Sequence, residues 1–401
     1  MDRRAGWHLR GLLTTGFAHG VSDFYSGMVP LLIFTIVSAH HLSPLYQGAI
    51  GFLWYLTSSI VQPLFGAYSD RSGRWWFLPV SVGLTAFAVS AIGISANIPM
   101  LCVLVIAGGI GSAVMHPEAG KYAALLSGDR KSGGISIFQI GGAAGYAAGP
   151  VVIASIIARF GTAGSLWMLV PGVLSVAMLA VLMHGINVYA DREKTARESA
   201  LSAAAKADSA GVALLVGGTA LRYLTGAAFM TYLPNLIVAR GGSIADAGAI
   251  VTAFLAVGAV GLYAGGWLGD RFGAVAISVL SLLLAVPALI GFFAFSGAAG
   301  LAALLLGNAL LNIQSAPSVA IVQQMLPRNL GMALGLMNGV AFGAGSALVT
   351  AVGFGVARAG AAQTLLWVGM LPVFCAAAYW IAGRRVAVRS YASAASNAAA
   401  S

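Results

Sequence analysis

Apolar runs long enough to cross a bilayer follow one another along almost the whole chain. Hydrophobic residues make up 59% of the 401 residues, and charged residues make up only 8%. A run of about 20 apolar residues spans the hydrocarbon as an α-helix, and these runs lack the alternation of barrel strands. Because backbone amides must pair within their own segment where water is absent, the sequence predicts an all-α membrane protein.

Polar or Gly/Pro-rich breaks divide the runs into twelve predicted transmembrane helices. The longest polar stretch, residues 187–208, carries both signs of charge and follows the sixth helix. We therefore predict a six-helix bundle over residues 1–186, a cytoplasmic linker over 187–209, and a second six-helix bundle with a short tail over 210–401. The predicted spans are residues 11–39, 46–69, 77–96, 99–126, 133–158, 163–186, 210–239, 246–268, 273–295, 299–326, 330–357 and 362–383.

The 21 Lys and Arg residues are distributed unevenly about these helices. If the N-terminus is cytoplasmic, all but four lie in tails, cytoplasmic loops or nearby helix ends. Arg159, Arg240 and Arg358 fall on the far side, and Arg222 lies inside a span. Since cytoplasmic loops carry the excess of basic residues, we predict a bacterial inner-membrane protein with both termini cytoplasmic. The net charge of +10 is then a topology signal, so the lipid bilayer is an expected partner and nucleic acid is not.

One charged loop occurs twice in the chain. The octapeptides GAYSDRSG, with Asp70, and GWLGDRFG, with Asp270, both fit Gly-x-x-x-Asp-Arg-x-Gly and lie 200 residues apart. Pro117 and Pro317 have the same spacing of 200. Two anchors at one offset indicate a duplicated six-helix unit. Each proline is also a candidate helix bend, because proline removes a backbone hydrogen bond.

The first octapeptide resembles the signature loop of the major facilitator superfamily, whose fold consists of two six-helix repeats. In that superfamily the loop is a conformational latch, in which the acid is thought to hold a helix N-terminus and a basic side chain. The resemblance implies a latch at Gly66, Asp70, Arg71, Gly73 and Arg74, and a second one at Asp270 and Arg271.

Four further motifs resemble the fosmidomycin resistance protein family. They are His19-x-x-x-Asp23, His116-Pro117-Glu118, the stretch SIFQIGG from residue 136, and the pair Arg222-Tyr223. That family is implied to export toxic compounds in exchange for protons. In the superfamily, the helices that carry the first, second and fourth of these motifs line the central cavity.

Few ionisable residues fall deep inside the predicted spans. Asp23 and Glu118 are the only two of the 11 acids there, and Arg222 is the only base. A charge at mid-bilayer costs at least about 2.5–3.5 kcal/mol on insertion scales, so each should face a wet cavity or a partner. Because a low-dielectric site favours a protonated carboxyl group, Glu118 and Asp23 are assigned to proton coupling, with Glu118 the first choice. His116 and His19 join them.

The same cavity is expected to bind the substrate. Arg222 suits a phosphonate or carboxylate group through paired hydrogen bonds, or serves as the counter-charge that expels the proton. Tyr223, Gln139, Asn312 and Asn338 are assigned to the same site as aromatic, donor and acceptor groups. For all of these residues, polar contact between helices is the alternative role.

Three functions are compatible with these residues. The first is a proton-coupled antiporter that exports a small toxic or drug-like compound, with an anionic one favoured, by alternating access. The alternative is a proton-coupled symporter that imports a small organic anion, because the sequence indicates the coupling residues better than the direction. The third is an intramembrane metalloenzyme with His19, Asp23, His116 and Glu118 as ligands, for which catalytic spacing such as His-Glu-x-x-His is missing. We expect a monomeric transporter of a small molecule, and neither enzyme activity, a cofactor nor a metal.

Overall fold

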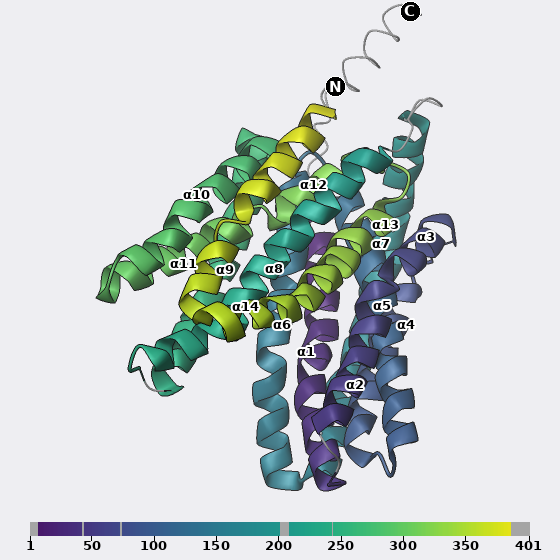
Figure 1. The fold of residues 1–401 in the computed structure, drawn as a ribbon. Helices are drawn as coiled ribbons and strands as arrows, with labels where there is room; N and C mark the ends of the chain where they lie inside the picture. The colour runs from purple at the N-terminus through teal and green to yellow at the C-terminus, as the bar shows by residue number, and fades with distance from the viewer. Residues whose placement is uncertain (1–6, 42–43, 73, 201–207, 243, 386–401) are drawn as a thin grey trace, which may run out of the picture. The chain divides into compact units, whose positions relative to one another are not determined.

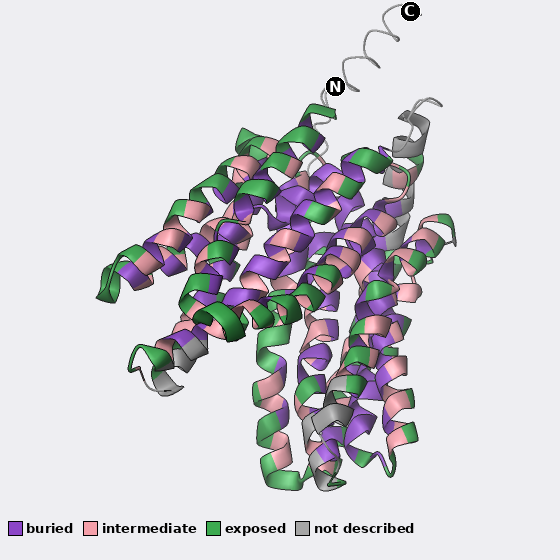
Figure 2. Ribbon diagram, viewed as in Figure 1, coloured by how far each residue is buried: buried purple, intermediate pink, exposed green. Residues whose placement is uncertain are grey.

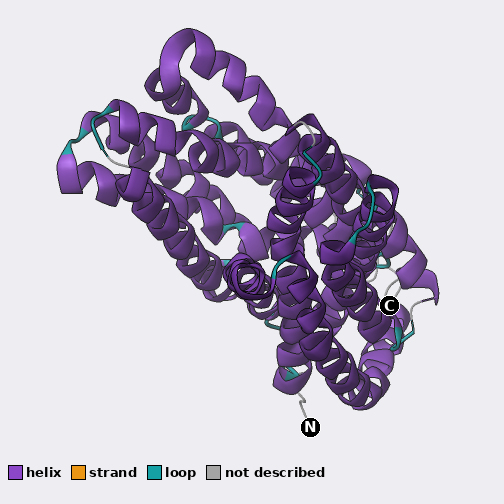
Figure 3. Ribbon diagram, turned by 90° about the horizontal axis from the view of Figure 1, so that it is seen from below, coloured by secondary structure: helices purple, strands orange, loops and turns teal. Residues whose placement is uncertain are grey.

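The computed structural model describes residues 7–41, 44–72, 74–200, 208–242 and 244–385. Within these ranges every regular element is a helix and there is no strand (Figure 3). The predicted all-α fold class is confirmed.

The N-terminal half of the chain is a succession of helices separated by short turns. Asn97 shows how one of them begins, since its side-chain oxygen accepts a hydrogen bond from Met100 N at 2.9 Å and so caps the first turn of α5. The elements are α1 (Leu9–Ala39), α2 (Pro44–Tyr55), the π-helical turn η1 (Leu56–Ile60), α3 (Gln62–Ser72), α4 (Phe77–Ala91), η2 (Ile92–Ile94), α5 (Ile98–Leu126), α6 (Lys131–Phe160), η3 (Thr162–Met168) and α7 (Leu169–Ala200).

The C-terminal half is built in the same way (Figure 1). The non-helical Gly360, with φ of 79°, interrupts the last long helix and turns the chain. The elements are α8 (Ser209–Ala239), α9 (Ile244–Phe272), α10 (Ala274–Ala294), α11 (Gly297–Ile313), α12 (Ser315–Met325), α13 (Leu330–Leu334), the π-helical turn η4 (Gly335–Val340), α14 (Ala341–Val368) and a final helix over 372–385.

The described residues contain 11 segments that are long and apolar enough to cross a membrane. The last of them, Leu330–Arg385, has 56 residues, whereas one pass needs about 20. Because Gly360 breaks this segment, it provides two passes. The twelve predicted membrane helices in two repeats are therefore present.

Two compact units can be distinguished in the fold. The first consists of Met1–Arg130, Ile137–Ala205 and Arg328–Gly339, and the second of Lys131–Ser136, Lys206–Pro327 and Val340–Ser401. Helix α7 remains helical to Ala200, through the first part of the stretch predicted as a linker. Residues 201–207 of that stretch lie outside the described residues.

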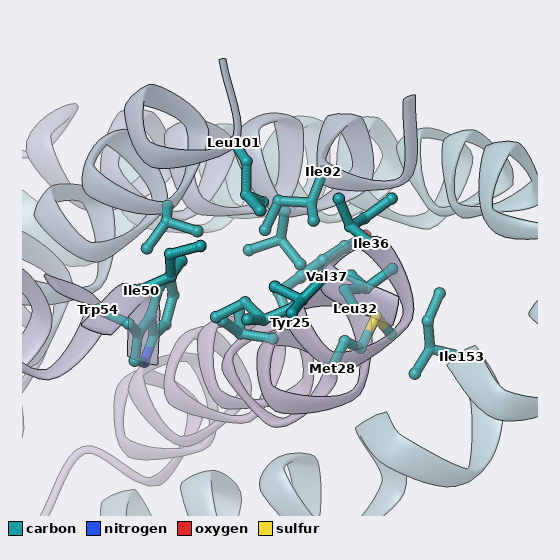
Figure 4. Close-up of a cluster of buried hydrophobic side chains, with 14 of the residues drawn as sticks. Tyr25, Met28, Leu32, Ile36, Val37, Ile50, Trp54, Ile92, Leu101 and Ile153 are labelled. Carbon is teal, nitrogen blue, oxygen red and sulfur yellow. The ribbon is translucent and has the colours of Figure 1, made fainter. Parts of the chain in front are cut away.

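Each unit has an apolar core of its own, and many large apolar side chains are exposed. Figure 2 shows that most helices carry both buried and exposed positions. Leu64, Val151 and Val181 are 69–74% exposed, as expected where lipid replaces water around the protein. The first core contains Tyr25, Met28, Leu32, Ile36, Val37, Ile50, Trp54, Ile92, Leu101 and Ile153 (Figure 4). The second contains Phe229, Leu233, Phe254, Leu289, Leu304 and Leu365.

Helices α1 and α6 approach each other closely in the first unit. A Cβ atom added at Gly145 would overlap the backbone carbonyl of Gly20, and one at Gly149 would overlap that of Phe24. Small residues at such spacing let membrane helices pack through their backbones. Glycine is therefore required at these positions by packing.

We expect Gly145→Val to destabilise the protein because the new side chain must push α1 and α6 apart. Overpacking of this kind costs about 1–3 kcal/mol. Thermal unfolding of the detergent-purified protein should begin at a clearly lower temperature than in the wild type. Gly185→Val is the matched control, because no atom lies within 4 Å of a Cβ added there. Equal unfolding temperatures for the two variants would contradict this account of the helix crossing.

Candidate functional site

Each carboxylate oxygen of Asp23 faces a histidine in the first unit. His19, one turn earlier on α1, places its Nε2 atom 3.2 Å from Asp23 Oδ2. His116 comes from α5 and places its Nε2 atom 3.3 Å from Asp23 Oδ1. The side chain of Asp23 is 18% exposed, and those of His19 and His116 are 7% and 12% exposed. Three of the four residues assigned to proton coupling thus form one cluster.

Backbone carbonyls orient both imidazole rings of this cluster. His19 Nδ1 lies 2.8 Å from the carbonyl oxygen of Phe138 on α6, and its ring stacks on the Phe138 ring with centroids 4.1 Å apart. His116 Nδ1 lies 2.8 Å from the carbonyl oxygen of Ser112, one turn earlier on α5. The His19 ring fits against α6 because position 142 is glycine, where a Cβ atom would overlap the ring. Both Nε2 atoms are therefore held towards the carboxylate.

Glu118 lies two residues after His116, but its carboxylate belongs to a different cluster. Its Oε2 atom accepts a hydrogen bond from Lys121 Nζ at 2.9 Å and another from the Ser69 hydroxyl. Lys121 Nζ also donates to Ser69 Oγ at 2.7 Å and to the Ser69 carbonyl at 3.2 Å. Glu118 Oε1 is buried and has no hydrogen-bond partner among the described residues. Glu118 is thus held by a buried ammonium group and a serine.

Lys121, which the sequence analysis grouped with the basic helix ends, is a second buried base within an apolar helix. Lys121 lies in the membrane-spanning segment Ile98–Leu126, and its side chain is only 8% exposed. In the sequence its place near the end of the helix makes it resemble the basic residues of a loop. The spacing of three residues from Glu118 was the available signal, because such pairs share a helix face. Lys121 and Ser69 are functional candidates that the sequence analysis missed.

Asp70, in the last turn of α3, holds the start of α13. Its Oδ1 atom accepts a hydrogen bond from Gly331 N at 3.0 Å, and its Oδ2 atom accepts one from Met332 N at 3.1 Å. A carboxylate at a helix N-terminus accepts hydrogen bonds from backbone amides that have no partner within the helix. Its negative charge also interacts favourably with the positive end of the helix dipole. A Cβ atom at Gly66 would lie 2.6 Å from the backbone of Gly331. The first glycine of the motif is therefore needed for this close approach.

Asp270 makes the equivalent contact in the second unit. Its Oδ1 atom accepts from Ser132 N at 2.8 Å, and its Oδ2 atom accepts from Gly133 N at 2.7 Å, at the start of α6. Arg271 is exposed and lies over the Trp267 ring, 5.3 Å from its centroid. Both copies of the repeated motif thus hold a helix N-terminus.

The other residues of the first latch contribute less to this contact. Arg71 and Arg74 are exposed. Gly73 lies outside the described residues. Lys194 on α7 donates to the backbone carbonyl of Asp70 at 3.2 Å, so the loop has a second basic neighbour that the motif itself does not contain.

Arg222 forms the polar centre of the second unit. It is 7% exposed, and its Nε atom donates to the carbonyl of Leu311 at 3.2 Å. Its Nη2 atom donates to Asn312 Oδ1 and, at 2.7 Å, to Ser315 Oγ. The guanidinium carbon lies 4.5 Å from the centroid of the Tyr223 ring. Among the described residues, no carboxylate forms an ion pair with this guanidinium.

Two helical elements meet beside Arg222. Helix α11 ends at Ile313 and α12 begins at Ser315, with Pro317 in its first turn. By contrast, α5 runs unbroken through Pro117. Gln314 between α11 and α12 keeps helical dihedral angles, with φ of −72° and ψ of −9°, so the two elements together form one membrane-spanning segment, Gly297–Met325. Pro317 lacks the backbone N–H group that would continue the helical hydrogen bonds, and it lies two residues after Ser315, which binds Arg222.

The predicted substrate residues are divided between the units. Tyr223 and Asn312 lie with Arg222 in the second unit. Gln139 lies in the first unit, directly after Phe138, and its Oε1 atom is buried without a partner among the described residues. Asn338 is partly buried in η4, which also belongs to the first unit.

The metal centre considered from the sequence requires four ligands. The ligand atoms of His19, Asp23 and His116 lie within 4.8 Å of one another. The Glu118 carboxylate instead binds Lys121 and Ser69. The four-ligand set is therefore not assembled in the part of the chain that the structure describes.

Comparison with known proteins extends over nearly the whole chain. The chain is 30% identical over 379 residues to the uncharacterized MFS-type transporter YfnC of Bacillus subtilis (strain 168), covering 90% of both proteins. It is 27% identical over 332 residues to the fosmidomycin resistance protein of Escherichia coli (strain K12), covering 82% of both. The crystal structure of the E. coli fucose:proton symporter FucP matches its fold with a TM-score of 0.69 and 16% identity, over 94% of this chain and 98% of that one.

The Bacillus relative is named as a transporter, which agrees with the expectation from the sequence that the protein is a transporter and not an enzyme. The family model named Major Facilitator Superfamily matches residues 14–350. With the multi-pass helical fold and the repeated motif, this match shows that the chain belongs to the major facilitator superfamily of membrane transporters.

Proposed function

We propose that this transporter is a proton-coupled antiporter that exports a small toxic or drug-like compound by alternating access. The observation that carries the proposal is the Asp23 carboxylate held between the Nε2 atoms of His19 and His116. Imidazole is the side chain that gains and loses charge near neutral pH, at about pH 6.5 when unperturbed. Such a cluster within the membrane is suited to taking up protons on one side and releasing them on the other.

Export is supported by the similarity to the E. coli protein whose name refers to fosmidomycin resistance. We propose a bacterial inner-membrane location with both termini cytoplasmic, as the distribution of basic residues predicts, and a monomer as the working unit. A symporter that imports an organic anion together with protons would use the same residues. The direction of proton movement relative to the compound distinguishes this symporter from the proposed antiporter.

Glu118 has a different role in this proposal from the one that the sequence favoured. Because Lys121 neutralises its charge, Glu118 is less suited than Asp23 to carry the transported proton. It hydrogen-bonds to Ser69, the residue before Asp70. We assign Glu118 to the connection between the proton site and the latch.

Arg222 is the proposed anchor for the substrate. Its buried guanidinium has neutral hydrogen-bond partners, so a phosphonate or carboxylate group of the substrate would supply the missing negative charge. Tyr223 and Asn312 lie beside it. Gln139 and Asn338, in the first unit, remain proposed substrate residues on the sequence argument alone. This arrangement favours a compound with an anionic group.

Transport by the purified protein in proteoliposomes tests the proposed function. With fosmidomycin as the first compound, an antiporter should accumulate it in vesicles with an acidic lumen, because protons then leave as the compound enters. A symporter should accumulate it only when the lumen is alkaline. If a screen of compounds finds transported compounds but their accumulation does not depend on the pH gradient, proton coupling itself is contradicted.

Asp23→Asn should abolish accumulation driven by the pH gradient. Exchange of labelled for unlabelled compound without a gradient should continue, because binding and reorientation do not require a net proton movement. Asp129→Asn is the control, since Asp129 is exposed in the turn before α6, and it should behave as the wild type. Gradient-driven transport that survives in Asp23→Asn would remove Asp23 from the coupling mechanism.

Arg222→Ala should weaken the affinity for an anionic compound by about tenfold or more, since hydrogen bonds to charged groups contribute about 1.5–3 kcal/mol each. Arg222→Lys keeps the charge but loses the paired geometry, so its affinity should be intermediate. The measurement is the concentration dependence of exchange. Arg358→Ala changes an exposed arginine and, as the control, should leave the affinity unchanged. If Arg222→Ala also leaves the affinity unchanged, Arg222 does not bind the substrate.

Asp70→Asn should slow transport without removing the protein from the membrane. Asparagine retains one acceptor oxygen, so one of the two hydrogen bonds to α13 and the negative charge are lost. The lost attraction between a carboxylate and a helix N-terminus is worth about 0.3–2 kcal/mol, which shifts an equilibrium between access states by up to about thirtyfold. Asp270→Asn should act in the same direction. If both variants are expressed normally and transport at the normal rate, the two aspartates do not act as latches between access states.

A further inference from the structure

We propose that the cluster of His19, Asp23 and His116 holds two exchangeable protons, one on the Nε2 atom of each histidine, with Asp23 as their shared counter-charge. The placement of these protons in a transport cycle depends on the proposed function. Their number follows from the hydrogen-bond geometry alone.

The Nδ1 atoms fix the first proton of each ring. His19 Nδ1 lies 2.8 Å from the carbonyl oxygen of Phe138, and His116 Nδ1 lies 2.8 Å from that of Ser112. A carbonyl oxygen only accepts hydrogen bonds, so each Nδ1 atom carries a proton in these contacts. The Ser112 hydroxyl, which could donate to His116 Nδ1, is more distant than the carbonyl, at 3.4 Å. A neutral imidazole has a single N–H group. If either ring were neutral, its Nε2 atom would present a lone pair.

The Nε2 atoms both face carboxylate oxygens, at 3.2 Å and 3.3 Å. An ionised carboxylate also presents only lone pairs, so an unprotonated Nε2 atom at this distance would repel it. A proton on each Nε2 atom converts both contacts into charge-assisted hydrogen bonds. The observed arrangement of His19, Asp23 and His116 therefore requires both protons.

One exchangeable proton does not satisfy this geometry. A single imidazolium leaves the other Nε2 atom opposite a bare carboxylate oxygen. A protonated Asp23 can donate from one oxygen only, so its other oxygen has the same conflict. Loss of either proton thus breaks one contact and frees one histidine from Asp23.

The surroundings favour a cluster with a net charge of +1. The Phe138 ring lies almost parallel to the His19 ring, at 22°, and offers its face to a cationic imidazole. The centroids of the two histidine rings are 4.8 Å apart, and the carboxylate between their Nε2 atoms offsets the repulsion of two positive charges. Asp23 therefore acts as the fixed charge, and the histidines carry the mobile protons.

Other titratable groups near the cluster do not alter this count. Tyr146 on α6 interacts electrostatically with Asp23, and Tyr55 from α2 interacts with Tyr146, but each contributes a phenol hydroxyl and not a fixed charge. Helix α4 contains no titratable side chain, and His184 of α7 contacts Trp75. On α5, Lys121 binds Glu118 and Ser69. The two exchangeable protons thus belong to the histidines.

Nitrogen NMR of the full chain labelled with ¹⁵N-histidine, in detergent, tests the proton count. The chain has six histidines, so the signals of His19 and His116 are identified by their loss in His19→Gln and His116→Gln. At mildly acidic pH both rings should be imidazolium. When the pH is raised, both should become neutral with the remaining proton on Nδ1.

Two further variants sharpen the test. In Asp23→Asn, at the pH where both wild-type rings are imidazolium, both imidazolium signals should be lost. His184→Gln, which changes an exposed ring, should leave the two signals unchanged. If Asp23→Asn does not fold, the wild-type titration still decides the proton count.

Three results would overturn the inference. One is a wild-type spectrum in which only one of the two rings ever becomes imidazolium. Another is a neutral form with its proton on Nε2. The third is a bound metal ion that occupies the Nε2 atoms in the purified protein. Gradient-driven transport with a one-proton cluster would refute this inference alone, whereas a two-proton cluster without gradient-driven transport would refute the proposed function alone.

Discussion

Without water in the hydrocarbon, every buried charge of this protein must be stabilised by other groups of the chain or by what the chain binds. An unpaired charge at that depth costs at least about 2.5–3.5 kcal/mol. Asp23 is stabilised by two imidazoles, Glu118 by an ammonium group and a hydroxyl, and Arg222 by a carbonyl, an amide and a hydroxyl oxygen. The three sets of partners differ chemically, so the three charged residues are suited to different roles.

Asp23 and Glu118 have different kinds of hydrogen-bond partner, and this difference makes them suited to different roles. The Lys121 ammonium group donates to the Glu118 carboxylate, so this ion pair is neutral as a unit and is suited to structure or to mechanical connection. An imidazole partner changes charge close to neutral pH, so the Asp23 cluster is suited to proton exchange. Arg222 differs from both, because the described residues give it hydrogen bonds but no negative charge.

The sequence predicted the fold and part of the site. The length of the apolar runs and the 200-residue offset of Asp70 and Asp270 were sufficient for the helices and the repeat, because both depend on local pattern. The four-residue spacing of His19 and Asp23 predicted a shared helix face. The contact with His116 and the separation of Glu118 depend on how α1 and α5 are rotated about their axes, which no spacing within one helix reveals. Lys121 was missed for a related reason, since its charge was attributed to topology.

The residues of the repeated loop and the helix prolines occur in both repeats, whereas the buried ionisable residues of α5 do not. At the offset of 200, Asp70 corresponds to Asp270 and Pro117 to Pro317, and both aspartates hold a helix N-terminus. At the same offset, alanine stands at position 316 for His116, serine at 318 for Glu118 and isoleucine at 321 for Lys121. The proposed proton cluster and the Glu118–Lys121 pair therefore have no counterpart at these positions, and the second repeat instead buries Arg222 in a membrane-spanning segment. In the first repeat, α5 carries His116 of the proton cluster and Glu118, which binds the neighbour of Asp70. In the proposed mechanism, a displacement of α5 when a histidine leaves Asp23 would thus act directly on the Asp70 contact, whereas positions 316, 318 and 321 give the Asp270 contact no such connection to an ionisable group.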